Sequence, residues 1–146
     1  MEQNKINLID KIFELNKNIY NTNDKPSELK VHKALYFIYG WFWNEYKEQL
    51  FENANFEAWD YGPVECDYRK TLFADQSLNL KKKFIINVSK EKEEFLDFNL
   101  EWLLKKTAFF LTSYSHLTKP WIENSVPAKE HGKNQINIDE ILNFFG

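Results

Sequence analysis

Residues 34–43 read ALYFIYGWFW, a run that is apolar on nearly every side of a helix. Ser27 is a good N-cap residue, because its hydroxyl can accept a hydrogen bond from a free backbone N–H group of the first turn. The sequence therefore predicts a helix from Ser27 to about Gln49, and we expect this helix to be central, since it has no polar face. Gly40 lowers its helix propensity by about 1 kcal/mol relative to alanine, which indicates either the close approach of another backbone or a kink.

Two amphipathic helices are predicted on either side of this segment. Ile6, Ile9 and Phe13 recur at helical spacing near the N-terminus, up to the polar loop NTNDKPS at residues 21–27. Ser89 can cap a third long helix that has acidic residues in its first turn. We expect this third helix to pack on the central one through apolar residues that recur at helical spacing: Phe95, Phe98, Trp102, Leu103, Phe109 and Phe110.

A short strand and a tight turn are predicted after the central helix. Residues 56–61, FEAWDY, alternate between two faces as a strand does. Gly62 permits a backbone angle that is closed to other residues, and Pro63 fits the first turn of a helix. We therefore expect a strand, a tight turn and a helix in direct succession, with the turn as a rigid junction.

Two further segments have the character of strands. Residues 78–88, LNLKKKFIINV, are rich in β-branched residues although their periodicity is weak. The short segment from Ile136 to Ile138 precedes a closing helix that Asp139 can cap. We expect the Ile136 segment to form a small sheet with residues 56–61. The predicted fold is α+β and predominantly helical: one domain over residues 1–146, with a core of two long helices and a small accessory sheet.

Composition favours a compact cytoplasmic protein. Aromatic residues make up 17% of the 146 residues, which leaves two interpretations: all of them belong to the core, or some lie at the surface as anchors for a partner. Cys66 is the single cysteine, so no intramolecular disulfide is possible. No apolar run approaches the ~20 residues that span a bilayer, and the N-terminus lacks the apolar segment of a signal peptide. We expect a reducing cytoplasm.

Several classes of function are disfavoured. The formal net charge of −3 gives no general attraction for phosphate backbones, so we expect no nucleic acid partner. The 4 glycines are too dispersed to form a phosphate-binding loop. We also expect no metal and no cofactor, because the candidate ligands lack the spacing of known zinc motifs: His32, Cys66, His116 and His131.

His116 is the candidate for a catalytic base. A histidine base needs a nucleophile or an orienting acid within hydrogen-bond reach, and the sequence supplies no recognisable one. Asp60, Glu65 and Asp67 flank the predicted turn, yet acidic residues beside a helix N-terminus stabilise the helix dipole without any catalytic role. We therefore predict no catalytic residue, and keep a small hydrolase that uses His116 with Asp60 or Asp67 as an alternative.

Three blocks of the sequence combine into a family resemblance. They read HKALYFIYGWFW at 32–43, LFENANFEAWDYGPVECDYRK at 50–70 and LTSYSHLTKPWIEN at 111–124, and INIDEILNFF follows at 136–145. Together they resemble the Panacea antitoxin domain, a family of SocA-like and GepA-like phage-associated proteins, over about residues 29–145. The matching residues are Lys33, Leu35, Tyr36, Phe37, Gly40, Trp41, Phe56, Glu57, Ala58, Trp59, Tyr61, Gly62, Pro63, Val64, His116, Pro120, Trp121, Ile136 and Phe145.

The resemblance implies an antitoxin that neutralises a toxin encoded beside it through direct contact. Members of the family oppose unrelated toxins, including nucleotide pyrophosphokinases related to alarmone synthetases, so an enzyme of that kind is one candidate partner. At least one relative delivers its toxin to a protease, which makes an adaptor function the alternative to simple neutralisation.

Four residues are our candidates for binding the partner: Trp59, Tyr61, Trp121 and His116. Large amphipathic rings beside a rigid turn are suited to be interface hot spots, although packing alone would also explain such rings. We assign a structural role to the other motif residues: Phe56, Glu57, Ala58, Gly62, Pro63, Val64, Gly40 and Pro120.

Overall fold

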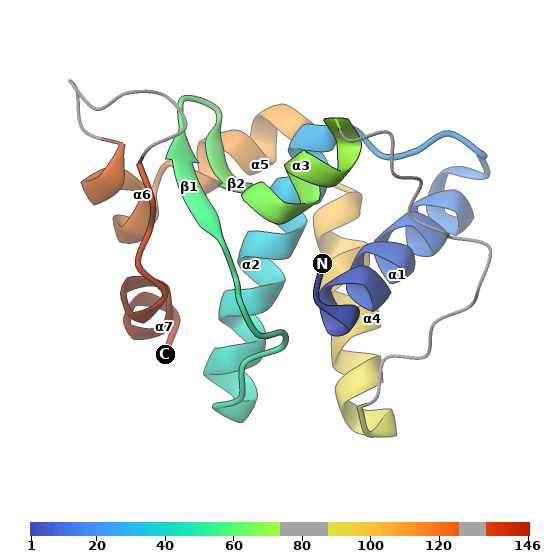
Figure 1. Ribbon diagram of the computed structural model, residues 1–146. Coiled ribbons are helices and arrows are strands. Elements are labelled where there is room, and N and C mark those ends of the chain that lie inside the picture. The colour runs from blue at the N-terminus through green and yellow to red at the C-terminus, as the bar shows by residue number, and fades with distance from the viewer. Residues whose placement is uncertain (74–87, 126–133) are drawn as a thin grey trace.

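The computed structural model describes residues 1–73, 88–125 and 134–146. Helices make up 66% of these residues, and a two-stranded antiparallel sheet is the other regular element (Figure 1). This confirms the predicted predominance of helices. The helices are α1 (Gln3–Tyr20), α2 (Glu28–Tyr46), α3 (Cys66–Phe73), α4 (Lys90–Leu104), α5 (Ala108–Ser115), α6 (Lys119–Asn124) and α7 (Ile138–Phe145), and the strands are β1 (Phe56–Trp59) and β2 (Gly62–Glu65).

Helix α2 lies among the other elements and is buried continuously over residues 31–40. The Ser27 side chain caps it by accepting a hydrogen bond from the Lys30 N–H group, as predicted. The helix ends at Tyr46, before the expected Gln49, because Lys47 adopts a left-handed conformation with φ of 52°. Contacts from α1, α4, α5, α7 and β2 surround it, and Figure 1 shows it in the middle of the molecule.

Gly40 of α2 faces a side chain and not a second backbone. A Cβ atom at this position would overlap the ring of Phe145, the last residue of α7. The expected approach of another backbone is therefore wrong: the missing side chain makes room for an aromatic ring. Tyr36 and Phe37 also meet that ring edge-on, so Gly40 is part of an aromatic contact between α2 and α7.

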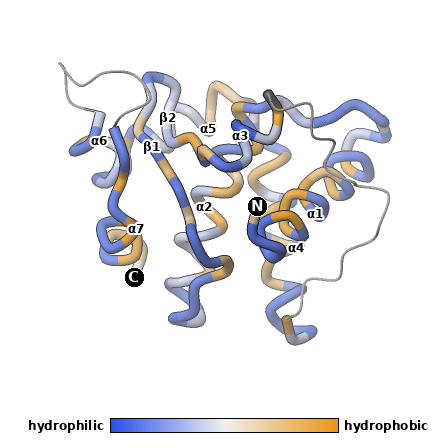
Figure 2. Tube along the Cα trace, viewed as in Figure 1, coloured by the Kyte–Doolittle hydropathy of each residue, from blue (hydrophilic) through white to orange (hydrophobic). Residues whose placement is uncertain are grey.

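The amphipathic helix α1 buries a cation together with its apolar face. Leu8, Ile9 and Ile12 are fully buried, whereas two residues of the predicted stripe, Ile6 and Phe13, are only half-buried. Lys5 is fully buried as well. The hydrophobic and hydrophilic residues that alternate along α1, α4 and α7 are visible in Figure 2, as expected of helices that bury one face.

The Lys5 ammonium group connects α1 to the start of α3. Its Nζ atom donates to Glu65 Oε2 at 2.9 Å and to Asp67 Oδ2 at 2.8 Å, and a third hydrogen bond reaches the Asn53 carbonyl oxygen at 3.0 Å. Both Lys5 and Glu65 are fully buried. The ammonium group therefore uses all three of its protons, which is the condition under which a buried charge is tolerated.

The predicted third long helix is two helices. Helix α4 begins at the Ser89 cap, as predicted, and ends at Leu104. Thr107 caps the separate helix α5 by accepting from the Phe110 N–H group. Helix α4 packs on α2 as expected, and four of its leucines are buried: Leu96, Leu100, Leu103 and Leu104. Of the residues predicted for this contact, Leu103 is buried, and the Phe95 and Trp102 rings meet aromatic rings of α2.

Several of the predicted core aromatics are therefore at the surface. Phe98 is 74% exposed, Phe109 is 81% exposed, and Trp102 and Phe110 are about 40% exposed. The prediction was wrong for Phe98, because leucines and aromatic residues both recur at helical spacing in this segment and the buried leucines occupy much of the face of α4 that packs on α2.

The predicted strand, turn and helix contain a second strand. Strands β1 and β2 pair as a hairpin in which Ala58 lies opposite Pro63 and Trp59 opposite Gly62. Gly62 has φ of +107°, which confirms the need for glycine. Pro63 therefore lies in a strand and not in the first helical turn, and α3 begins only at Cys66, where the Glu65 carboxylate accepts from the Tyr68 N–H group at 2.9 Å.

The C-terminal segment extends the sheet as predicted. The Ile136 N–H group donates to the Phe56 carbonyl, and the Ala58 N–H group donates to the Asn134 carbonyl, both at 2.8 Å. Helix α7 is capped by Asn137 and not by Asp139, whose N–H group donates to the Asn137 side chain. Apart from Val88, the strand predicted at 78–88 lies outside the described residues. None of the described helices combines the length and apolar character needed to cross a membrane.

Replacing Lys5 with methionine should destabilise the fold strongly, because it leaves the Glu65 carboxylate buried without its cation. We expect a loss of roughly 3–5 kcal/mol in the free energy of unfolding, as for other broken buried pairs. Lys11→Met is the matched control: Lys11 is also on α1 and pairs with Glu93 and Asp97, but both acids are nearly half-exposed, so the loss should be about 1 kcal/mol or less. Urea unfolding of both variants measures the difference, and equal losses would contradict the role given to Lys5.

The contact between Gly40 and Phe145 predicts that the effect of Gly40→Ala on the free energy of unfolding changes sign when Phe145 is removed. Gly40→Ala alone should destabilise the protein, because an overpacked core costs about 1–3 kcal/mol. In a Phe145→Ala background the same substitution should stabilise it by up to about 1 kcal/mol, since only the gain in helix propensity remains. Urea unfolding of the four proteins tests this, and a Gly40→Ala effect that is the same in both backgrounds would refute the contact.

Candidate functional site

The predicted partner-binding residues meet at the tip of the hairpin, where it contacts α5 and α6. The Trp121 Nε1 atom donates to the Trp59 carbonyl oxygen at 2.8 Å. The His116 imidazole stacks on the Trp121 ring, with the ring centroids 3.8 Å apart and the planes 16° from parallel. Tyr61 lies in the connection between β1 and β2 and is 65% exposed. We refer to Trp59, Tyr61, His116 and Trp121 as the hairpin-tip surface.

Two contacts hold the Trp59 side chain in place. Its Nε1 atom donates to Glu57 Oε1 at 2.8 Å, and the Arg69 guanidinium group lies 4.7 Å from the ring centroid. The guanidinium group also pairs with the Glu28 carboxylate of α2. A half-buried indole held in this way supports the hairpin, which leaves Tyr61 as the most exposed ring of the surface.

His116 ends α5, with its backbone N–H group donating to the Thr112 carbonyl. Burial lowers the pKa of its imidazole, and the neighbouring Lys33 charge acts in the same direction, against the opposing effect of the Asp60 backbone carbonyl. Its Nε2 atom is buried and has no hydrogen-bond partner within the described ranges. The imidazole is therefore neutral near pH 7, with a ring face that is covered by Trp121.

The carboxylates proposed for a hydrolase lie in other contacts. Asp67 accepts hydrogen bonds from Lys5 and Asn55, which outweigh the effect of burial and lower its pKa. Asp60 meets His116 through its backbone carbonyl. In the part of the chain that the structure describes, we find no hydrogen bond between His116 and a carboxylate.

Lys33 lies beneath the Gly62 turn and is the residue that sequence reasoning missed. It is fully buried, and its Nζ atom has no hydrogen-bond partner among the residues described. A Cβ atom on Gly62 would lie 2.7 Å from Lys33 Cε and 2.6 Å from Ser115 Oγ, so α2, the hairpin and α5 converge here. Burial lowers the pKa of Lys33 to about 8, although the Glu28 carboxylate acts to raise it. The sequence marked Lys33 as a residue of the family resemblance and as a lysine directly before the apolar run, but neither signal indicated its burial.

His32, the neighbouring residue on α2, is by contrast fully paired. Its Nδ1 atom accepts from the Glu65 N–H group at 3.1 Å, so the proton is on Nε2, which donates to Glu28 Oε1 at 3.0 Å. Burial lowers the pKa of His32 to about 4. Burial also raises the pKa of the Cys66 thiol to about 12, which makes it unreactive near neutral pH. No group of three potential metal ligands occurs within residues 1–73, 88–125 and 134–146.

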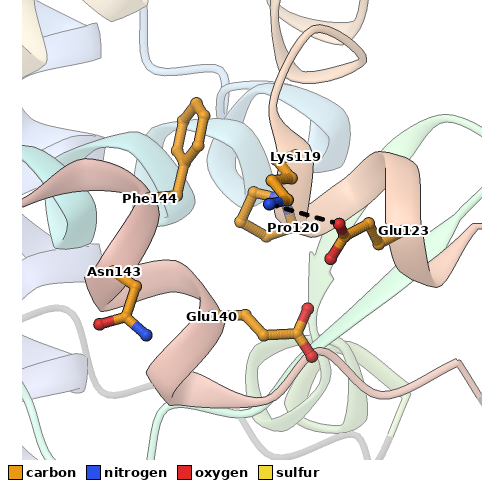
Figure 3. A pocket seen from close by; sticks show the side chains of 6 residues that line it. All are labelled: Lys119, Pro120, Glu123, Glu140, Asn143 and Phe144. Atoms are coloured by element: carbon orange, nitrogen blue, oxygen red, sulfur yellow. Dashed lines mark ion pairs between the residues drawn. The ribbon is translucent and has the colours of Figure 1, made fainter.

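A pocket lies between α6 and α7 (Figure 3). Its volume is about 400 Å³. Lys119 and Glu123 pair across one turn of α6 at 3.6 Å, and Glu140 of α7 accepts from the Asn124 side chain at 2.8 Å. Figure 3 shows the α6 side chains facing those of α7. The pocket is lined by Lys119, Pro120, Glu123, Glu140, Asn143 and Phe144.

The residues that were given structural roles are buried, apart from the half-buried Glu57: Phe56, Ala58, Gly62, Pro63, Val64, Gly40 and Pro120.

Comparison with known proteins gives one match. The family model described as antitoxin SocA-like, Panacea domain, matches residues 31–122, which is more than half of the chain. No curated protein and no solved structure matches. The matched range contains the whole hairpin-tip surface and Lys33.

Lys33→Met should remove a dependence of stability on pH. Because the folded pKa of Lys33 is about 8 and its ordinary value is 10.5, the unfolded state binds the proton more tightly between these values. The free energy of unfolding of the wild type should therefore rise with pH from about 8 to 10.5, by roughly 3 kcal/mol at most. The variant should lack this rise and be more stable than the wild type at pH 7.

Urea unfolding at several pH values tests this prediction, with Lys25→Met, in an exposed loop, as the control that keeps the wild-type pH dependence. If the free energy of unfolding depended on pH in the same way for the wild type and for Lys33→Met, the pH dependence would not come from Lys33.

Proposed function

We propose that this chain, which belongs to the SocA-like Panacea domain family, is an antitoxin that binds a protein toxin and neutralises it by direct contact. The observation that carries the proposal is the family match over residues 31–122. We further propose that the toxin is encoded by an adjacent gene and is met in the cytoplasm. An alarmone-synthetase-like enzyme is one candidate for it.

The hairpin-tip surface is the binding site that we propose. Tyr61 is a large amphipathic ring that is 65% exposed, and rings of this type are frequent hot spots of interfaces. Its backbone position is fixed, because the hairpin register sets the two-residue connection and Trp121 holds the end of β1. A side chain on a backbone that is already ordered adds no cost of loop ordering when a complex forms.

Two exposed apolar residues adjoin the hairpin-tip surface in the chain. Leu117 follows His116 and Ile122 follows Trp121, and both are exposed. The pocket between α6 and α7 contains two carboxylates and the exposed Phe144 ring. We propose that these residues extend the toxin interface from the hairpin tip across α6. An apolar centre with a polar edge is the usual composition of a specific protein interface.

We infer that the protein does not act as an enzyme. This inference is supported by the contacts of His116, which are the Trp121 ring and the Asp60 backbone carbonyl. A general base needs to reach the proton that it removes, and stacking on Trp121 instead suits His116 to position that indole. Ser115 Oγ donates to the Thr112 carbonyl at 2.8 Å and is fully buried, so it is poorly placed as a nucleophile.

Co-expression with the product of the adjacent gene tests the function. If the chain is an antitoxin, the neighbour arrests growth when expressed alone, and this chain restores growth and co-purifies with it as a stable complex. Direct neutralisation also predicts that inactive toxin persists in the cells. A toxin that disappears only when both the chain and a protease are present would indicate the adaptor function instead, and a harmless neighbour with no complex would refute the antitoxin assignment.

Tyr61→Ala should abolish neutralisation without unfolding the protein. Loss of a hot-spot ring raises the dissociation constant by about 30-fold or more, whereas stability should change by less than about 0.5 kcal/mol because the side chain is mostly exposed. Phe109→Ala is the matched control: this ring is 81% exposed and lies at the opposite end of α5 from His116. Titration calorimetry with the purified toxin gives the affinities. Wild-type affinity of Tyr61→Ala would exclude the hairpin tip as the centre of the interface.

A further inference from the structure

One face of α4 carries a continuous exposed stripe. Its residues are spaced by three or four positions, which places them above one another on the helix. All five are exposed, with Phe98 at 74% and Trp102 at 39%. We refer to them as the α4 stripe: Glu91, Glu94, Phe98, Trp102 and Lys105.

The other faces of α4 are already occupied. The buried leucines pack toward α2, and Lys11 of α1 pairs with Glu93 and Asp97 on a second face. The α4 stripe lies between these two faces, and its Trp102 ring borders α2 through contact with Trp41. It presents the exposed Phe98 ring and the partly exposed Trp102 ring to solvent, with two acidic residues before them and one lysine after them.

Trp102 is held in place, whereas Phe98 is free of ring contacts among the described residues. The Trp102 ring meets Trp41 at 5.9 Å and Phe110 at 6.1 Å between centroids, and the Lys106 ammonium group lies 4.6 Å from its centroid. The Trp102 indole offers a fixed flat surface, and the protruding Phe98 ring of a second molecule can pack on such a surface.

The order of charges along the stripe makes it complementary to itself. The acidic residues Glu91 and Glu94 precede the rings and Lys105 follows them. A second α4 in the antiparallel direction would bring unlike charges together, whereas a parallel one would set Glu94 against Glu94. Antiparallel helices also align their dipoles favourably. In its own helix Lys105 pairs with Glu101, but both side chains are about half-exposed, so that pair is weak and easily exchanged.

We propose that the α4 stripe is the surface through which two copies of this chain associate. A twofold axis passes between Phe98 and Trp102, so that Phe98 of each copy lies on Trp102 of the other. In the same register the position opposite Glu94 is 106, so Lys105 of the second copy lies one residue, about 1.5 Å, along the helix axis from it. Twofold symmetry forms each contact twice. The occupant of the stripe is a second copy and not the toxin, because the charge order fits the stripe itself.

Self-association can be tested without the toxin, so its failure and that of the antitoxin function are distinguishable. Sedimentation velocity over a wide range of protein concentration should show a reversible dimer of the wild-type chain. Phe98→Asp should raise the dimer dissociation constant by about 30-fold or more. Its circular dichroism should be unchanged, and so should its thermal unfolding at concentrations at which the wild type is monomeric, because the side chain is mostly exposed. Phe144→Asp, an exposed phenylalanine on α7, is the control that should still dimerise.

Charge reversal tests the register. Glu94→Lys and Lys105→Glu should each weaken the dimer by roughly tenfold, since two symmetric ion pairs become repulsive, and the double variant should recover most of the wild-type affinity. A wild-type chain that is monomeric at every concentration, or a double variant that is no better than the single ones, would overturn the proposal. The proposal would also be overturned if the chain were monomeric and needed Phe98 to bind the toxin, because the α4 stripe would then belong to the toxin interface.

Discussion

A helix without a polar face has to be covered on all sides, and this constraint organises the molecule. Residues 31–40 of α2 are buried without interruption. Their burial requires neighbours from every direction, and α1, α4, α5, α7 and β2 supply them. The last aromatic residue of the chain, Phe145, reaches α2 at Gly40. Segments far apart in the sequence are thus brought together by their packing on one helix.

Because α2 is covered on all sides, its polar residues His32 and Lys33 are buried as well. The two residues differ in their hydrogen bonding, and this difference points to the candidate site. His32 finds a partner for each ring nitrogen, in Glu28 and in the Glu65 N–H group. Lys33 has none for its Nζ atom within the described residues. A buried ammonium group without a partner lowers stability, and Lys33 lies beneath the glycine turn that presents Tyr61. A buried ammonium group without a partner among the described residues therefore lies at the base of the proposed binding surface. Proteins commonly give up stability at positions that serve function.

Patterns of neighbouring residues predicted most helices and strands, whereas contacts between residues far apart in the sequence could not be predicted from such patterns. The Ser27 and Ser89 caps and strand β1 follow from neighbouring residues alone. The break between α4 and α5 was missed because aromatic residues and leucines share the same periodicity, and β2 was missed because Pro63 also fits a helix start. The pairing of Lys5 with Glu65 joins positions 60 residues apart, and nothing in either segment indicates the other. Of the site, the rings at the hairpin tip were predicted, but Lys33 was not, since burial of a lysine depends on the packing of three elements.

The two proposed surfaces use the same kinds of side chain on different parts of the scaffold. The hairpin-tip surface is built from β1, α5 and α6, and the α4 stripe lies on a helix on the other side of α2 in the view of Figure 1. They have no residue in common, so their contributions to binding should be nearly independent. Under the two proposals, substitutions around Tyr61 would alter which toxin is bound and would leave the contact between copies intact. A twofold dimer through α4 would carry two hairpin tips, and a toxin that presents two sites would be held more tightly than either contact alone allows, because the second contact forms within the complex.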